Sequence, residues 1–67
     1  MTLGEDRVRL SFNPGGNEQV RVIKELAANL IDEIDQSGGD ERCLALAMTA
    51  IEEGCMWAVK AVTMPPE

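Results

Sequence analysis

The sequence is poor in the side chains that most often carry out chemistry. It has no histidine and no tyrosine, and its only aromatic residues are one phenylalanine and one tryptophan. Without histidine the chain lacks the commonest general base and the commonest metal ligand. Its two cysteines form no CxxC pair, so we expect no metal site and no cofactor. These absences predict a protein that is not an enzyme.

The two cysteines, Cys43 and Cys55, are not expected to pair with each other. They lie twelve residues apart on what the periodicity predicts to be one helix, which separates them by about 18 Å. A disulfide requires Cα atoms closer than about 7 Å. No signal peptide opens the chain, and no apolar run approaches the length of a membrane span. We therefore expect a cytoplasmic protein with reduced thiols and no membrane contact.

The chain is short, and its core must be small. With 67 residues it forms one domain at most, spanning 1–67. A chain of this size buries only about 60% of its unfolded surface, so its core alone is marginal for stability. Since neither disulfides nor metal are expected, oligomerisation is the remaining source of stability.

Acidic residues predominate, and the basic ones are unevenly placed. The net charge is −6, which argues against binding of a DNA or RNA polymer. Residues 1–25 carry four basic and four acidic residues, whereas residues 26–67 carry two basic and eight acidic ones. Four of the six basic residues, Arg7, Arg9, Arg21 and Lys24, therefore flank the segment "SFNPGG". This placement is typical either of a solvated surface or of a small anion site beside an aromatic ring.

Residues 1–17 are predicted to form a short N-terminal arm. Within "RVRLSF", Val8, Leu10 and Phe12 alternate with polar residues, which is typical of an extended segment. With no second strand to pair with, the arm is expected to be extended, or a single short turn, and to pack on a neighbour. Pro14 and the two following glycines end it.

Two helices are predicted after the arm, over 18–35 and 40–63. The first begins after Asn17 as N-cap, the Gly38-Gly39 pair stops it, and Asp40 caps the second. Pro65-Pro66 is predicted to stop the second helix. The fold class is therefore all-α, an antiparallel helical hairpin with a short N-terminal arm.

The second helix has more apolar surface than the first helix can cover. Its two apolar stripes are Leu44, Ala47, Met48, Ile51, Cys55, Ala58 and Val62, and then Leu46, Ala50, Trp57 and Ala61. The first stripe is expected to face the other helix. The second would be covered by the arm or by another subunit, and the arm is small for that task. The sequence therefore predicts a compact homo-oligomer.

The segment around Phe12 is the best candidate for a ligand site. Phe12 either fixes the loop onto the helices or offers its ring to a base. The helix that begins near Asn17 would present free backbone N–H groups to an anion, with Arg21 and Lys24 one to two turns away. Trp57 is expected to be an interface anchor rather than a ligand contact. Thr49 and Glu52 are either solvent-facing residues or the edge of a pocket.

Three segments of the sequence resemble a known family. They are the aromatic-x-Pro turn "FNP", the helix "EQVRVIKELAANLIDEI" and the segment "DERCLALAMTAIEEGCMWAVKAVT". Together they resemble the hairpin domain of the phage anti-CBASS sponges, the family of anti-CBASS protein two, and a related hairpin occurs in a phage anti-Thoeris sponge. The resemblance covers about residues 12–63.

The resemblance implies a specific function. Members of this family assemble as compact homo-oligomers, typically hexamers, and bind cyclic dinucleotides such as cyclic GMP-AMP between protomers without cleaving them. Some also bind cyclic trinucleotides. Capture of the signal blocks CBASS antiviral signalling in the infected bacterial cell, so the chain is expected to be a phage immune-evasion protein.

The resemblance also implies site residues. Phe12 matches the family's aromatic before proline, where a tyrosine is frequent, so any contact made by the tyrosine hydroxyl is lost here. Lys24, with Arg21 as the near alternative, matches the basic residue of the first helix, and Thr49 matches a threonine of the second. The candidate ligand-binding residues are Phe12, Asn13, Pro14, Lys24, Arg9, Arg21 and Thr49.

One rival function remains from the sequence. The chain could instead be a small homo-oligomeric helical module that binds a protein or inhibits a host protein, with Leu46, Ala50 and Trp57 facing that partner. Cleavage of a cyclic nucleotide is disfavoured, because histidine and metal ligands are missing.

Overall fold

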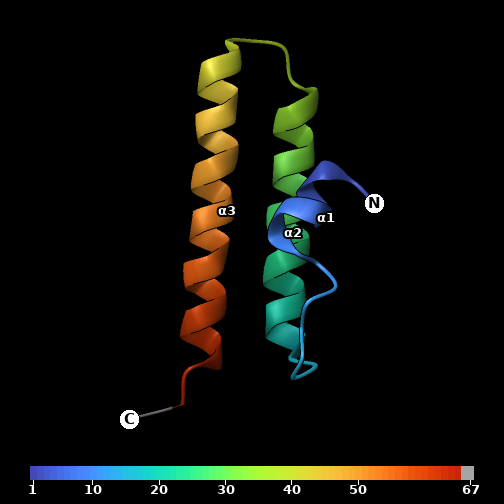
Figure 1. Ribbon diagram of the computed structural model, residues 1–67, viewed down its shortest axis with the longest axis vertical. Helices are drawn as coiled ribbons and strands as arrows, with labels where there is room; N and C mark the ends of the chain where they lie inside the picture. The colour runs from blue at the N-terminus through green and yellow to red at the C-terminus, as the bar shows by residue number, and fades with distance from the viewer. Residues whose placement is uncertain (66–67) are drawn as a thin grey trace.

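Three helices make up the described part of the molecule, which is residues 1–65 of a computed structural model. They are α1 (Leu3–Val8), α2 (Glu18–Gln36) and α3 (Glu41–Thr63), and no strand occurs among these residues. Helices α2 and α3 run antiparallel side by side, and α1 lies across α2 (Figure 1). The predicted all-helical class is therefore confirmed, and the long pair forms the expected hairpin. The molecule is flat, with extents of 43 × 25 × 12 Å.

The N-terminal arm was predicted to be extended or a single short turn, and the extended form was wrong, because residues 3–8 form the short helix α1. Thr2 and Glu5 form a capping box: Thr2 Oγ1 accepts from the Glu5 N–H at 3.1 Å, and Glu5 Oε1 accepts from the Thr2 N–H at 2.8 Å. The helix ends at Arg9, which adopts the left-handed conformation with φ 55°. A turn follows, in which the Phe12 N–H donates to the Arg9 carbonyl oxygen at 2.8 Å, so the alternation of Val8, Leu10 and Phe12 does not correspond to a strand.

The ends of α2 and α3 lie close to the predicted positions. The Asn17 side chain accepts hydrogen bonds from the N–H groups of Gln19 and Val20, and Asp40 accepts one from Cys43. Both predicted N-caps are thus present. Helix α2 extends one residue beyond the predicted end, and α3 ends at Thr63. Of the two prolines predicted to stop α3, Pro66 lies outside the described residues, as does the last residue of the predicted 1–67 domain.

The core lies where α1 and α3 meet α2. Its buried apolar residues are Val8, Val20, Ala28, Ile31 and Cys55. The stripe of α3 predicted to face inward is buried or half-buried throughout, and the stripe predicted to face outward is exposed throughout. On α2 burial does not follow residue type alone, since Leu30 is 49% exposed whereas the charged residue Lys24 is buried.

Helix α1 contacts α2 closely because it has a glycine at the crossing point. The backbone N–H of Gly4 donates to Asp32 Oδ1 at 2.6 Å. A Cβ atom at this position would lie 2.0 Å from the carbonyl oxygen of Ala28 and 2.8 Å from Asp32 Oδ1. No side chain fits in that space, so only glycine permits this approach of the two backbones.

Gly4→Ala is therefore expected to destabilise the protein. Overpacking of this kind typically costs about 1–3 kcal/mol, because α1 must move away from Ala28 and lose the bond to Asp32. Urea denaturation at one fixed protomer concentration measures the change in the free energy of unfolding.

Gly54→Ala is the matched control. Gly54 lies within α3, and a Cβ there meets nothing within 4 Å. Alanine in a helix interior is better than glycine by about 0.8–1 kcal/mol, so this variant should be more stable than the wild type. Equal effects of the two substitutions would show that α1 does not approach α2 as described.

Candidate functional site

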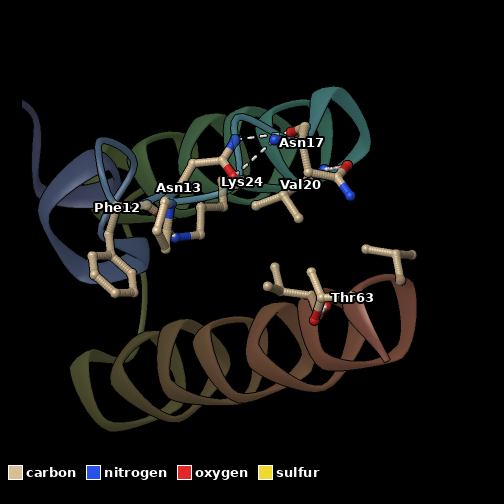
Figure 2. A pocket seen from close by; sticks show the side chains of 10 residues that line it. Phe12, Asn13, Asn17, Val20, Lys24 and Thr63 are labelled. Atoms are coloured by element: carbon tan, nitrogen blue, oxygen red, sulfur yellow. Dashed lines mark hydrogen bonds between the residues drawn. The ribbon is translucent and has the colours of Figure 1, made fainter. Parts of the chain in front are cut away.

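An open groove of about 530 Å³ lies between the loop that follows α1 and the last turns of α3. Phe12, Asn13, Pro14 and Gly15 of the loop line one side. Residues of the first turns of α2 form the floor, and residues at the end of α3 lie opposite. Figure 2 shows Phe12 at one end of the groove, with Thr63 across from the loop on α3. Four of the seven predicted ligand-binding residues therefore line the groove: Phe12, Asn13 and Pro14 of the loop, and Lys24 of α2.

The loop is fixed to the start of α2 by a reciprocal pair of hydrogen bonds. Asn13 Nδ2 donates to the carbonyl oxygen of Asn17 at 2.8 Å, and the Asn17 N–H donates to Asn13 Oδ1 at 3.1 Å (Figure 2). Asn17 in turn accepts from the N–H groups of Gln19 and Val20. The start of α2 was predicted to present free backbone N–H groups to an anion, but the Asn17 cap occupies those of Gln19 and Val20.

Lys24, a fourth predicted residue, lies beneath the loop. Its side chain is buried, with 6% exposed, and its ammonium group donates to the carbonyl oxygens of Arg9, at 3.0 Å, and of Phe12. Burial lowers the pKa of Lys24; proximity to the Cys55 thiolate would raise it, and the charge of Arg9 lowers it further. Lys24 is therefore a floor residue held by the backbone of the loop.

The Phe12 side chain is exposed, and two cationic groups lie close to its ring. Its exposed fraction is 54%. The guanidinium carbon of Arg9 lies 4.3 Å from the ring centroid, and Lys24 Nζ lies 5.5 Å from it. Both distances are within the range of cation–π attraction. Arg9, a fifth predicted residue, is thus at the ring, although it lines a neighbouring hollow rather than the groove itself.

That neighbouring hollow has a volume of about 360 Å³ and shares Phe12, Lys24 and Val59 with the groove. Its other lining residues include Arg7, Arg9, Cys55 and Met56. Burial raises the pKa of the Cys55 thiol, with Lys24 acting in the opposite direction. The higher pKa disfavours the thiolate, so Cys55 forms part of the apolar wall of the hollow.

Arg21 does not join the other predicted residues. Its guanidinium pairs with Glu18 and, at 2.7 Å, with Glu25, which are neighbours on the exposed face of α2. These carboxylates raise the pKa of Arg21 above its usual value. The side chain lines neither hollow. Of the two basic residues considered for α2, only Lys24 is at the groove.

Thr49 also lies apart from the groove. Its hydroxyl accepts from Arg7 Nη2 at 3.2 Å, and Arg7 Nε donates to Glu52 Oε1 at 2.9 Å. This contact joins α1 to α3. Thr49 and Glu52 were predicted to be either solvent-facing residues or the edge of a pocket. Both contact Arg7 of α1, and Glu52 also lines the neighbouring hollow.

Sequence reasoning missed several lining residues of the groove. They are Asn17, Val20, Val59, Val62 and Thr63, together with Gly15. Asn17 and Val20 follow the loop directly, so their proximity to it could have been expected. The α3 residues give no such signal, because the register of the hairpin decides which of them faces the loop.

Asn13→Ala is expected to lower the free energy of unfolding by about 1–2 kcal/mol, because it removes both bonds between the loop and Asn17. Thermal denaturation at fixed concentration measures it. Gln19→Ala is the control: that exposed residue takes part in the cap only through its backbone N–H, so its substitution should change stability little. A neutral Asn13→Ala would mean that the loop is held without this pair.

Over residues 1–65 no group of three or more cysteine, aspartate or glutamate side chains is arranged to hold a metal ion. None of the helices described there combines the length and the apolar character needed to cross a bilayer.

Comparison with known proteins identifies the family. The model of the family described as "Acb2/Tad1, hairpin domain" matches residues 4–63. No curated protein and no solved structure matches the chain. The matched range contains all three helices apart from Leu3, and it includes the segments on which the resemblance to the phage anti-CBASS sponges depends. That resemblance is confirmed, and the chain belongs to the Acb2/Tad1 hairpin-domain family.

Proposed function

We propose that this protein sequesters cyclic dinucleotides, such as cyclic GMP-AMP, at the groove beside Phe12. Capture without cleavage would keep the signal from its effector and block CBASS signalling in the cytoplasm of the infected bacterium. The observation that carries the proposal is an exposed aromatic ring with two cations within 5.5 Å, on a chain of net charge −6. A flat ring among cations suits a base joined to a phosphate.

The dimensions of the groove support a ligand of this class. Its volume of about 530 Å³ falls within the range of about 300–1,000 Å³ typical of small-molecule sites. The lining combines apolar side chains, Val20, Val59 and Val62, with the amide of Asn13 and the hydroxyl of Thr63. Apolar walls with a few polar groups favour a planar, heteroatom-rich ligand over a long polymer.

Each residue at the ring has a role in this proposal. Phe12 stacks on a purine, which is worth about 1–3 kcal/mol per base. Arg9 and Lys24 provide the positive potential for the phosphates, while the acidic remainder of the surface disfavours nucleic-acid polymers. Asn13 and Pro14 hold the loop in shape. Thr49 matches the family pattern, and Arg21 is the alternative to Lys24 there, but their side chains are engaged by Arg7 and by Glu18 and Glu25.

Assembly into a homo-oligomer, a hexamer by analogy with the family, is part of the proposal. The accessible surface of one chain is 4889 Å², whereas a compact monomer of this mass would expose about 4,200 Å². Large apolar side chains on both long helices are exposed: Val22, Leu26, Leu30, Leu46, Met56 and Trp57. A partner subunit that covers these side chains would reduce the excess of exposed surface and would close the groove from its open side.

The family consists of binding proteins of the sponge type, and retention of intact ligand fits that character. A cyclic trinucleotide could be held as well, at another place on the assembly. The rival, a module that binds a host protein, draws support from Trp57, which is 61% exposed. Light scattering distinguishes sequestration from binding of a host protein, since in a stable homo-oligomer the face that carries Trp57 is covered by another subunit.

Calorimetric titration with a panel of cyclic dinucleotides tests the function. The wild-type protein should bind at least one of them, and the ligand recovered after denaturation should be intact. Phe12→Ala should weaken binding by about 5- to 150-fold, which corresponds to the loss of one stacked base. The oligomer should persist in this variant.

Two matched variants serve as controls. Phe12→Tyr keeps the ring and should bind as the wild type does. Arg21→Gln removes a cation that lies outside the groove and should also leave binding unchanged. Normal binding by Phe12→Ala would move the site elsewhere, and a product recovered in place of intact ligand would replace sequestration with catalysis.

A further inference from the structure

Lys24 is placed differently from a lysine that contacts a ligand. It comes from the second turn of α2, it is 6% exposed, and its ammonium points into the backbone of the segment that follows α1. A cation that meets a mobile phosphate usually keeps its head group in solvent on a flexible stem. Here the residue is buried, its head group donates to two backbone carbonyl oxygens, and the Phe12 ring centroid lies 5.5 Å from Nζ.

The hydrogen-bond inventory of Lys24 supports the same conclusion. An ammonium group has three N–H donors and no acceptor. Two of them are engaged by the carbonyl oxygens of Arg9 and Phe12. The carbonyl oxygen of Arg9 also accepts from the Phe12 N–H, at 2.8 Å. Lys24, Arg9 and Phe12 therefore form a small hydrogen-bond network, which joins the backbone just before residue 10 to the backbone just after residue 11.

Arg9 has the opposite arrangement. Its side chain is exposed, and within residues 1–65 its guanidinium makes no ion pair. Its backbone is left-handed, which costs a residue other than glycine about 1–2 kcal/mol. Glycine would fit this position at the end of α1 without strain. An arginine at this position places a guanidinium 4.3 Å from the Phe12 ring centroid.

We infer that Lys24 is a positioning residue for ligand binding: it holds the carbonyls of Arg9 and Phe12 so that the Phe12 ring stands between the groove and the neighbouring hollow, and it does not itself bind the phosphate. This inference rests on the proposed function for the identity of the ligand. The exposed cation beside the ring is then Arg9. A Lys24 variant loses affinity because the ring is no longer held, and this loss is visible in the protein without ligand.

The chain offers a direct readout, because it has a single phenylalanine and no tyrosine. Nuclear magnetic resonance of protein labelled only at phenylalanine reports the Phe12 ring without overlap. Amide hydrogen exchange reports the Phe12 N–H. Both are measured on the full chain without ligand, at the wild-type oligomeric state checked by light scattering.

Lys24→Met keeps the length of the stem and removes all donors. It should shift the Phe12 ring signals and the backbone amide signals of residues 10–13, and it should speed exchange of the Phe12 amide at least fivefold. Arg9→Gln is the matched control. It removes the guanidinium without introducing glycine, so it should shift the ring signals alone and leave the amide exchange within twofold of the wild type.

Calorimetry with the cyclic dinucleotide that the wild type binds best completes the test. Both variants should bind about tenfold more weakly or worse. The inference is overturned if Lys24→Met leaves the ring signals and the Phe12 amide exchange unchanged in the free protein yet loses binding, because Lys24 would then contact the ligand directly. Unchanged binding by Lys24→Met would overturn it equally.

Two further outcomes are distinguished by the same data. If Lys24→Met lacks helical circular dichroism, Lys24→Gln, which keeps N–H donors on a shorter stem, takes its place with the same criteria. If the wild type binds no cyclic dinucleotide, the proposed function fails, and the ligand-free spectra still show whether Lys24 fixes the ring.

Discussion

The buried ammonium of Lys24 is the interaction on which the arrangement of the groove depends. A charge removed from water must be hydrogen-bonded, and among residues 1–65 the ammonium donates to the carbonyl oxygens of Arg9 and Phe12. Because Lys24 belongs to α2 and needs these two acceptors, it determines where the segment after α1 lies. Gly4 acts at the other end of α1 by permitting its backbone to approach Ala28. Between these two contacts, α1 has little freedom to move.

The two long helices could be predicted from the sequence because each local signal agrees with the others. Asn17 and Asp40 cap the helices as expected, and the inward stripe of α3 follows from its spacing alone. Helix α1 was missed for a definite reason. The alternation around Val8 indicated an extended segment, whereas the Thr2-x-x-Glu5 capping box, a stronger signal for a helix start, preceded it. After the left-handed Arg9, the alternating residues no longer share one face: Val8 is buried, whereas Phe12 is exposed.

The candidate site was predictable only in part. Phe12 and Lys24 were identified from residue type and position, and the structure places them together. Arg21 was a reasonable alternative by spacing, but its carboxylate neighbours on the same helix hold it at the surface. Thr49 depends on long-range structure. No pattern within α3 indicates that Arg7, forty-two residues earlier, reaches its hydroxyl, because that contact exists only once α1 has docked.

The flat shape of the chain links ligand binding to assembly in the proposed function. With an extent of 12 Å in its thinnest direction, the molecule has room for one layer of helices, and the groove on its face is open to solvent. A second subunit would supply the remaining wall and at the same time cover apolar side chains such as Leu46 and Trp57. The ligand and the subunit interface then stabilise the same closed state, and by linkage each strengthens the other. A protein that works by retaining a signal molecule benefits from this coupling, because a closed wall slows release of the ligand without requiring any chemistry.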